Sequence, residues 1–151
     1  MRYVTLAAGL LAASAQGQTL RPELDYASAA TIRDTCVAWA SAKKLAVSVA
    51  VFDRHGNLVA QGHMDRAPAA VGEIAQWKGR SAARIQAASA DTAKWGGSAP
   101  GIADWRGGVP FTTRDGAPLG GVGVSGASSA DDEACGKAGI AAAGLAAVPA
   151  G

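Results

Sequence analysis

The stretch "LAVSVAVFDRHGNLVAQGH" (residues 45–63) decides the fold class. Its first nine residues alternate β-branched valines with other residues, which favours a strand over 45–53. The turn "RHGN" follows, with Gly56 and Asn57 as candidates for positive φ, and a returning strand is predicted over 58–63. Two strands joined by so short a turn form an antiparallel hairpin.

Similar signals extend in both directions from this hairpin. Apolar residues recur at helical spacing before and after it, and glycine-rich turns separate two further strands. The predicted helices cover 25–44, 68–87, a short piece at 89–95, and a last helix from Ser128 or Ser129 through 147; the predicted strands cover 109–113 and 117–125. The order α-β-β-α-β-β-α predicts an α+β fold in which helices flank an antiparallel sheet.

The stretch "GGVGVSG" (residues 120–126) fits the G-x-G-x-x-G pattern of dinucleotide-binding loops. That fingerprint needs a strand before it, a helix directly after it and a later strand that completes a βαβ unit. Here the glycines lie inside a predicted hairpin strand, and no strand is predicted to follow the last helix. We therefore reject nucleotide binding and expect a backbone or a ligand to approach these glycines closely.

The N-terminus, "MRYVTLAAGLLAASAQGQ", is typical of an export signal. Arg2 provides the basic region, a short apolar run follows, and Ala13 and Ala15 supply the small residues of a cleavage site after Ala15. We expect residues 1–15 to be a signal peptide, 16–24 an N-terminal tail and 25–151 a single domain. The protein is then periplasmic or secreted, and no other stretch is apolar and long enough to span a membrane.

Cys36 and Cys135 are the chain's two cysteines, and both lie in predicted helices near opposite ends of the domain. Two cysteines in an exported chain either form a disulfide or remain separate buried thiols. The two cysteines and two histidines do not show the spacing of a metal site.

The charge balance excludes one class of partner. Lys and Arg number 14 and Asp and Glu 12, so the formal net charge is +2, and loss of Arg2 with the signal peptide brings it to +1. A chain this close to neutral has no electrostatic footprint for nucleic acid.

Four ordered motifs carry a resemblance to a known family. They are "SVAVFDRHGNLVAQGHMDRA" (48–67), "AQWKGRSA" (75–82), "GGVPF" with "DGAPLGGVGVSG" (107–126) and "DDEACGKAG" (131–139). Together they resemble the GlcG/HbpS-like haem-binding family, which includes the C-terminal domain of PduO-type proteins. The resemblance covers about residues 26–147.

This resemblance implies a profilin-like, three-layer arrangement, homo-oligomers, and haem as the candidate cofactor. The chain departs from the family pattern in the first motif, where His63 stands in place of the usual Arg. Gly79 and Ser81 also replace the usual Ala and Thr of the second motif.

His63, Asp65 and Lys78 are the residues we expect to carry chemistry. His63 ends the second strand and is a candidate haem-iron ligand or general base. Asp65 lies two residues later and either assists His63 or caps the following helix. Lys78 matches the motif lysine, and it either faces a ligand or lies on a solvated helix face.

Three tryptophans near the predicted helix at 68–87 and the glycine-rich loop indicate a flat aromatic ligand, or else core and subunit packing. These are Trp77, Trp95 and Trp105. Arg80 is a candidate for binding an anionic group of that ligand. Ser125 does not fit a nucleophile elbow, so we place it among the ligand-binding residues rather than assigning a serine hydrolase.

Three functions fit this sequence. The first is an exported protein that binds haem or a similar planar aromatic molecule, as a homo-oligomer without nucleic-acid or membrane partners. The second is a cofactor-independent lyase or isomerase that acts on a small phenolic substrate, with His63, Asp65 and Lys78 as its acid–base set. The third is an oligomeric sensor or structural module.

Overall fold

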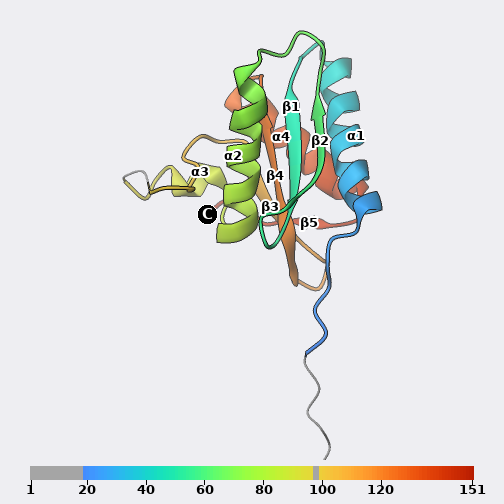
Figure 1. Cartoon of the computed structure of the whole chain (residues 1–151), viewed down its shortest axis with the longest axis vertical. Helices are drawn as coiled ribbons and strands as arrows, with labels where there is room; N and C mark the ends of the chain where they lie inside the picture. Colours follow the sequence, from blue (N-terminus) through green and yellow to red (C-terminus); the bar gives the residue numbers. More distant parts are fainter. Residues whose placement is uncertain (1–18, 97–98) are drawn as a thin grey trace, which may run out of the picture.

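The structure is a computed structural model that describes residues 19–96 and 99–151. Residues 19–25 have no regular secondary structure and lead into the first helix. The elements are α1 (Tyr26–Ala42), β1 (Ser48–Asp53), β2 (Leu58–His63), α2 (Ala70–Ile85), α3 (Ser89–Thr92), β3 (Gly108–Thr112), β4 (Pro118–Ser125), α4 (Ser129–Ala142) and β5 (Ala146–Ala147), as Figure 1 shows. Within these ranges no helix is long and apolar enough to cross a membrane.

The sheet has five strands in the order β2-β1-β4-β3-β5, and every neighbouring pair is antiparallel. The predicted hairpin is confirmed, and Gly56 adopts the expected positive φ of 86°. Asn57 does not share that conformation. Its backbone N–H and its side-chain amide instead donate to the Asp53 carboxylate at 2.9 Å each, which holds the turn closed.

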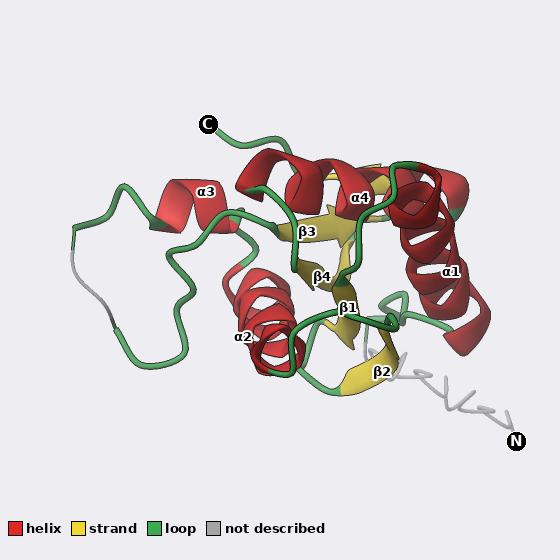
Figure 2. Cartoon of the chain, turned by 90° about the horizontal axis from the view of Figure 1, so that it is seen from above, coloured by secondary structure: helices red, strands yellow, loops and turns green. Residues whose placement is uncertain are grey.

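Helices cover both faces of the sheet, which gives the expected three layers (Figure 2). α2 lies across one face, over β1, β3 and β4. α1 and α4 pack side by side on the other face, and the larger hydrophobic core fills the space between them and the sheet.

The two faces of β1 and β4 explain the glycine-rich strand. Alternate side chains point to opposite faces of a sheet, so Val122 and Val124 join the core beneath α1 and α4 while Gly121 and Gly123 face α2. A Cβ on Gly123 would meet the backbone of Ala75 and Gly79 in α2. The glycines of "GGVGVSG" therefore allow a helix backbone to approach the sheet closely.

The end of the chain departs from the prediction. The last helix begins as expected, because the Ser128 side chain accepts from the Asp131 backbone N–H at 3.1 Å. It ends at Ala142 rather than continuing to 147, since Gly144 adopts a φ of 72° and turns the chain back. Residues 146–147 then form β5, which pairs with β3 at the edge of the sheet.

A disulfide joins α1 to α4. It links Cys36 to Cys135 with a Cα–Cα distance of 4.8 Å, so the two thiols are not separate. Close packing accompanies the bridge, because a Cβ on Gly139 would lie 3.0 Å from the backbone carbon atoms of Ile32.

Candidate functional site

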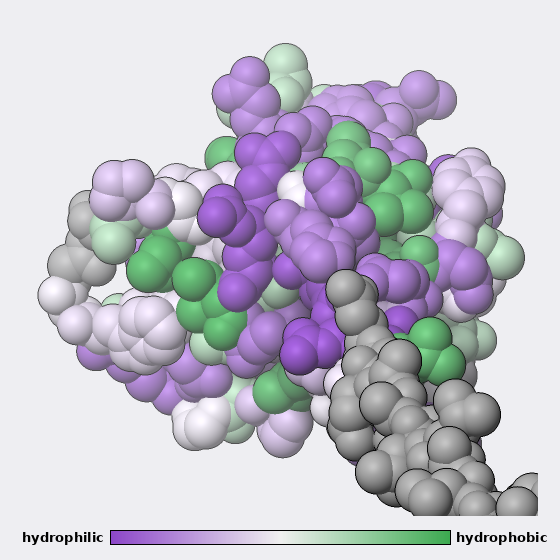
Figure 3. Space-filling view, turned by 60° about the horizontal axis from the view of Figure 1, so that its bottom comes forward, coloured by the Kyte–Doolittle hydropathy of each residue, from purple (hydrophilic) through white to green (hydrophobic). Residues whose placement is uncertain are grey.

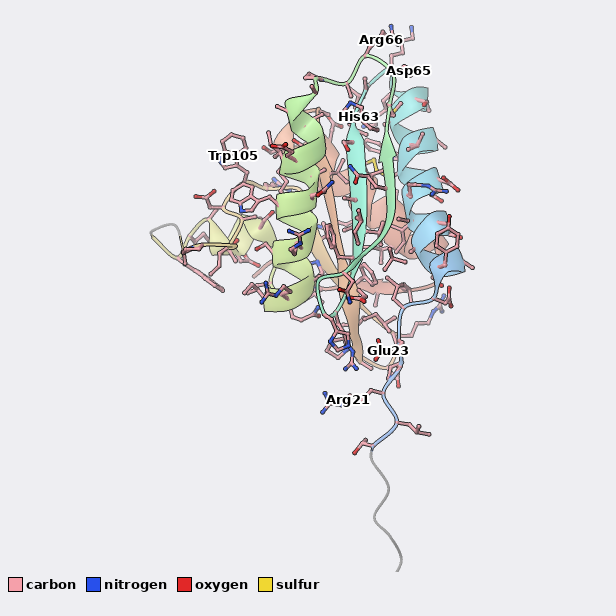
Figure 4. All side chains as sticks on the ribbon, in the orientation of Figure 1. Arg21, Glu23, His63, Asp65, Arg66 and Trp105 are labelled. Carbon is pink, nitrogen blue, oxygen red and sulfur yellow. A yellow bond between two sulfur atoms is a disulfide. The ribbon has the colours of Figure 1, made fainter. Side chains whose placement is uncertain are left out.

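His63 lines a hollow at one end of the sheet. It is the last residue of β2 and pairs with Ser48 at the start of β1. Val37, His63, Met64, Asp65 and Arg66 line an open surface depression of about 440 Å³. Figure 4 shows His63, Asp65 and Arg66 together at this end of the molecule. We call this space the His63 hollow; its volume lies in the range of small-molecule sites.

The loop after β2 is held by local contacts. The Met64 sulfur accepts from the Val47 backbone N–H at 3.5 Å, and His63 Nε2 lies 3.2 Å from the Ala67 carbonyl oxygen. Arg66 adopts a left-handed φ of 69°, which costs a non-glycine residue on the order of 1 kcal/mol. Lys44 and Gln86 adopt the same left-handed conformation elsewhere in the fold, so this conformation alone does not mark the loop as a binding site.

The structure excludes one of the two roles expected for Asp65, that of a cap for the helix α2. α2 begins after Ala69, which makes no side-chain capping hydrogen bond, so Asp65 does not cap this helix. Its exposed carboxylate instead lines the His63 hollow.

Gly72 lies beside the imidazole of His63. A neutral ring that donates from Nε2 to Ala67 keeps its lone pair on Nδ1. A Cβ on Gly72 would lie 3.5 Å from that Nδ1, so Nδ1 faces the side-chain-free start of α2. The Ala67 carbonyl oxygen thus holds one ring nitrogen of His63, and the other ring nitrogen lies beside the start of α2.

Lys78 lies elsewhere, inside the protein. It is 2% exposed, and its ammonium donates to the Val124 carbonyl oxygen at 2.9 Å and to Asp132 at 3.1 Å. The second Asp132 oxygen accepts from the Ala127 backbone N–H at 3.0 Å. Lys78 therefore ties α2 to the end of β4 and the start of α4, and is neither on a solvated face nor beside His63.

Burial raises the pKa of the Asp132 carboxyl, although the neighbouring Lys78 ammonium and the Ala127 N–H act in the opposite direction. Sequence reasoning missed this partner of Lys78. The run "DDE" predicted only a favourable helix start, and nothing in it distinguishes the buried Asp132 from the half-exposed Asp131.

Two of the three tryptophans meet. The rings of Trp77 and Trp105 have centroids 6.2 Å apart and pack edge to face. Trp105 is 59% exposed, lies beside α2 in Figure 4, and lines a second hollow of about 660 Å³. Trp95 does not line this hollow, and it is 56% exposed. The expected cluster of three is thus a pair and a separate residue.

A charged triad that sequence reasoning missed borders the Trp105 hollow. Glu133 is buried at the start of α4 and accepts hydrogen bonds from Arg106 and Lys137. Burial alone would raise the pKa of Glu133, but the two cations outweigh it and lower that pKa. In the sequence, only the i,i+4 spacing of Glu133 and Lys137 indicated an ion pair at this place.

The loop that carries Trp105 is anchored by buried hydroxyl groups. Ser81 accepts from the Ala103 backbone N–H and Ser89 accepts from the Gly108 backbone N–H, each at 2.8 Å. Ser81, which departs from the family pattern, thus fixes this loop against α2.

The remaining predicted residues lie apart from the His63 hollow. The Arg80 guanidinium lies over the Phe52 ring at 5.1 Å, towards the β1–β2 turn. Ser125 is buried at the end of β4, opposite Ser48. Across residues 19–96 and 99–151, no three His, Cys, Asp or Glu side chains gather as a metal site.

Comparisons with known proteins agree with this architecture. The family model described as "Haem degrading protein HbpS-like" matches residues 24–141. A double mutant of HbpS from Streptomyces reticuli is 31% identical, with a TM-score of 0.76, and the match covers 90% of this chain and 97% of that one.

Two more distant structures share the fold. A PduOC complex with haem is 23% identical with a TM-score of 0.76, and the match covers 85% of this chain and all of that one. The protein ORFY from Klebsiella pneumoniae is 22% identical with a TM-score of 0.74, and the match covers 85% and 94% of the two chains. No curated protein sequence matches significantly.

Proposed function

The chain belongs to the HbpS-like family, and on this premise we propose that it binds haem in the His63 hollow, with His63 as the iron ligand. The observation that carries the proposal is the position of His63. It is an exposed imidazole that lines a hollow and has one nitrogen fixed by a carbonyl oxygen.

The residues of the hollow fit a haem group chemically. His63 offers an imidazole nitrogen, which is a common haem-iron ligand. Val37 and Met64 provide apolar surface for a porphyrin edge, and Arg66 provides a cation for a propionate. Haem would supply the redox-active iron, while the chain orients His63 through the Ala67 carbonyl oxygen.

The acid–base alternative has less support. It required His63, Asp65 and Lys78 in one site, and Lys78 is held inside the protein by Asp132 and the Val124 carbonyl. A binding role requires only the residues that line the hollow.

A haemin titration followed by absorption spectroscopy tests the proposal. We expect a saturable, one-per-chain Soret shift, and we expect His63→Ala to weaken binding by at least about tenfold because the iron ligand is lost. His55→Ala is the matched control, since His55 is the chain's other histidine and lies in the β1–β2 turn.

Two outcomes would contradict the assignment. Equal haem affinity of His63→Ala and the unaltered chain would exclude His63 as the ligand. Loss of binding in Trp105→Ala alone would place a planar ligand in the Trp105 hollow instead.

Export and self-association complete the proposal. The predicted signal peptide at 1–15 lies outside the described residues, and the Cys36–Cys135 bridge, of a kind found in oxidising compartments outside the cytoplasm, supports export. We further propose a homo-oligomer, in which a second copy would cover the exposed rings of Trp95 and Trp105.

A further inference from the structure

A third hollow lies at the other end of the molecule from His63. It encloses about 540 Å³ between residues 20–22, the β1–β2 turn, the C-terminal end of α2 and the turn before β4. We call it the N-terminal hollow. Figure 4 shows Arg21 and Glu23 at this end, opposite His63, Asp65 and Arg66.

Positive charge dominates this hollow. Arg21, Arg54 and Arg84 line it, and Glu23 is the carboxylate that pairs with Arg54 and lies near His55. The Arg54 Nη2 atom lies 2.6 Å from the Glu23 carboxylate, which lowers the pKa of Glu23. In the described part of the chain, neither Arg21 nor Arg84 has an ion-pair partner.

Arg54 is incompletely satisfied. Its Nε atom is the one buried side-chain nitrogen or oxygen in the described residues that has no hydrogen-bond partner. A guanidinium binds a carboxylate best through two parallel N–H groups, whereas Glu23 is bound through Nη2. Buried N–H donors almost always have an acceptor, and a carboxylate that bound Arg54 through both of its oxygens would supply one to Nε.

The backbone directs Arg84 towards the same hollow. A Cβ on Gly56 would lie 2.7 Å from the Arg84 Cδ atom, so the arginine stem crosses the side-chain-free tip of the β1–β2 turn. Arg84 and Arg54 therefore both line the N-terminal hollow, one from α2 and one from the β1–β2 turn.

Apolar side chains complete the lining. Leu20, Ala83 and Pro118 provide apolar surface next to the arginines. Figure 3, which brings this end forward, shows strongly hydrophilic surface gathered across the middle of the face and hydrophobic patches bordering it. Charge beside apolar surface matches a ligand that has both an anionic head and an apolar body.

We propose that the N-terminal hollow binds a small organic carboxylate, and that Glu23 occupies the place of that carboxylate on Arg54 in the free chain. The segment that carries Glu23 is then an internal competitor, which the ligand displaces from Arg54. This inference concerns residues remote from His63 and does not depend on haem binding.

Benzoate is the probe, titrated into the purified protein while the Arg Nε–H and backbone amide signals are followed by NMR. We expect saturable shifts that include Arg54. Glu23→Gln should bind benzoate about two- to fivefold more tightly, because an exposed ion pair no longer competes. Arg54→Gln and Arg84→Gln should each weaken binding by about tenfold or more, because a charge-assisted hydrogen bond is lost.

Matched controls distinguish binding in the N-terminal hollow from nonspecific attraction of the benzoate anion to positively charged side chains. Arg33→Gln removes one positive charge from α1, where Arg33 pairs with Asp34, and should leave benzoate binding unchanged. Benzamide, which lacks the charge, and acetate, which lacks the apolar body, should both bind more weakly than benzoate. Unchanged amide spectra elsewhere in each variant establish that it is folded.

Three results would overturn the proposal. The first is the absence of saturable benzoate binding in Glu23→Gln. The second is binding that Arg54→Gln and Arg84→Gln leave intact. The third is binding of inorganic phosphate as tight as that of benzoate, which would exclude selection of a carboxylate, or equally tight binding of acetate, which would exclude selection of an apolar body.

Discussion

Glu133 holds two cations from a buried position, and this predicts a pH-dependent stability. Its pKa is lowered in the folded chain, so its contribution is present above the ordinary carboxyl value of 4.5. The contribution is lost as the pH falls through the lower folded-state pKa. We expect Glu133→Gln to reduce the free energy of unfolding by about 1–2 kcal/mol at pH 7, with the difference shrinking below pH 4.5.

Urea denaturation across this pH range measures the effect. Glu73→Gln, on the exposed first turn of α2, is the control that should leave the pH dependence unchanged. Equal effects of the two substitutions would show that Arg106 and Lys137 contribute nothing through Glu133.

At the scale of elements, α1 and α4 depend on a glycine where they touch. Alanine normally favours a helix interior over glycine by about 1 kcal/mol. At Gly139 alanine should instead be less stable than glycine, because the added methyl group would clash with the Ile32 backbone. We expect Gly139→Ala to destabilise the protein by about 1–3 kcal/mol in thermal or urea unfolding.

Gly72→Ala provides the comparison. It is also helical, but its added methyl would meet only ordinary contacts, the nearest at 3.5 Å. It should be neutral or stabilising by up to about 1 kcal/mol. Equal changes in the free energy of unfolding for Gly139→Ala and Gly72→Ala would show that close packing of α1 on α4 at Gly139 does not affect stability.

The elements also show which features a sequence can predict. The β1–β2 hairpin was predictable because valine alternation and a Gly-containing turn are local signals. β5 was not, since two alanines become a strand only when Gly144 turns them back against β3. The Lys78–Asp132 pair was missed for the same reason, because the two residues are 54 positions apart and only the fold brings them together.

For the site, the motif pointed to His63 and Asp65 because His63 ends β2 and Asp65 lies in the loop directly after it. The positions of the other two hollows were harder to predict from the sequence, because each is lined by separate parts of the chain. The N-terminal hollow combines four separate parts of the chain, and the Trp105 hollow depends on loop anchoring by Ser81 and Ser89.

For the molecule as a whole, the Cys36–Cys135 bridge should be the largest single contribution to stability. It closes a loop with a sequence separation of 99 residues. A loop of this length corresponds to about 4–5 kcal/mol in the chain-entropy model. We expect urea unfolding of the oxidised and reduced chains to differ by about that amount.

The double variant Cys36→Ser with Cys135→Ser should behave like the reduced chain under both conditions. An unchanged unfolding midpoint after reduction would show that the bridge does not restrict the unfolded chain enough to contribute to stability.

The same bridge has a consequence for degradation. All strands except β5, the whole of α2 and every loop between them lie inside the covalent ring that Cys36 and Cys135 close. A protease that cuts once anywhere in this ring opens it without releasing a fragment. The nicked chain stays a single covalent molecule and keeps both halves of its sheet side by side.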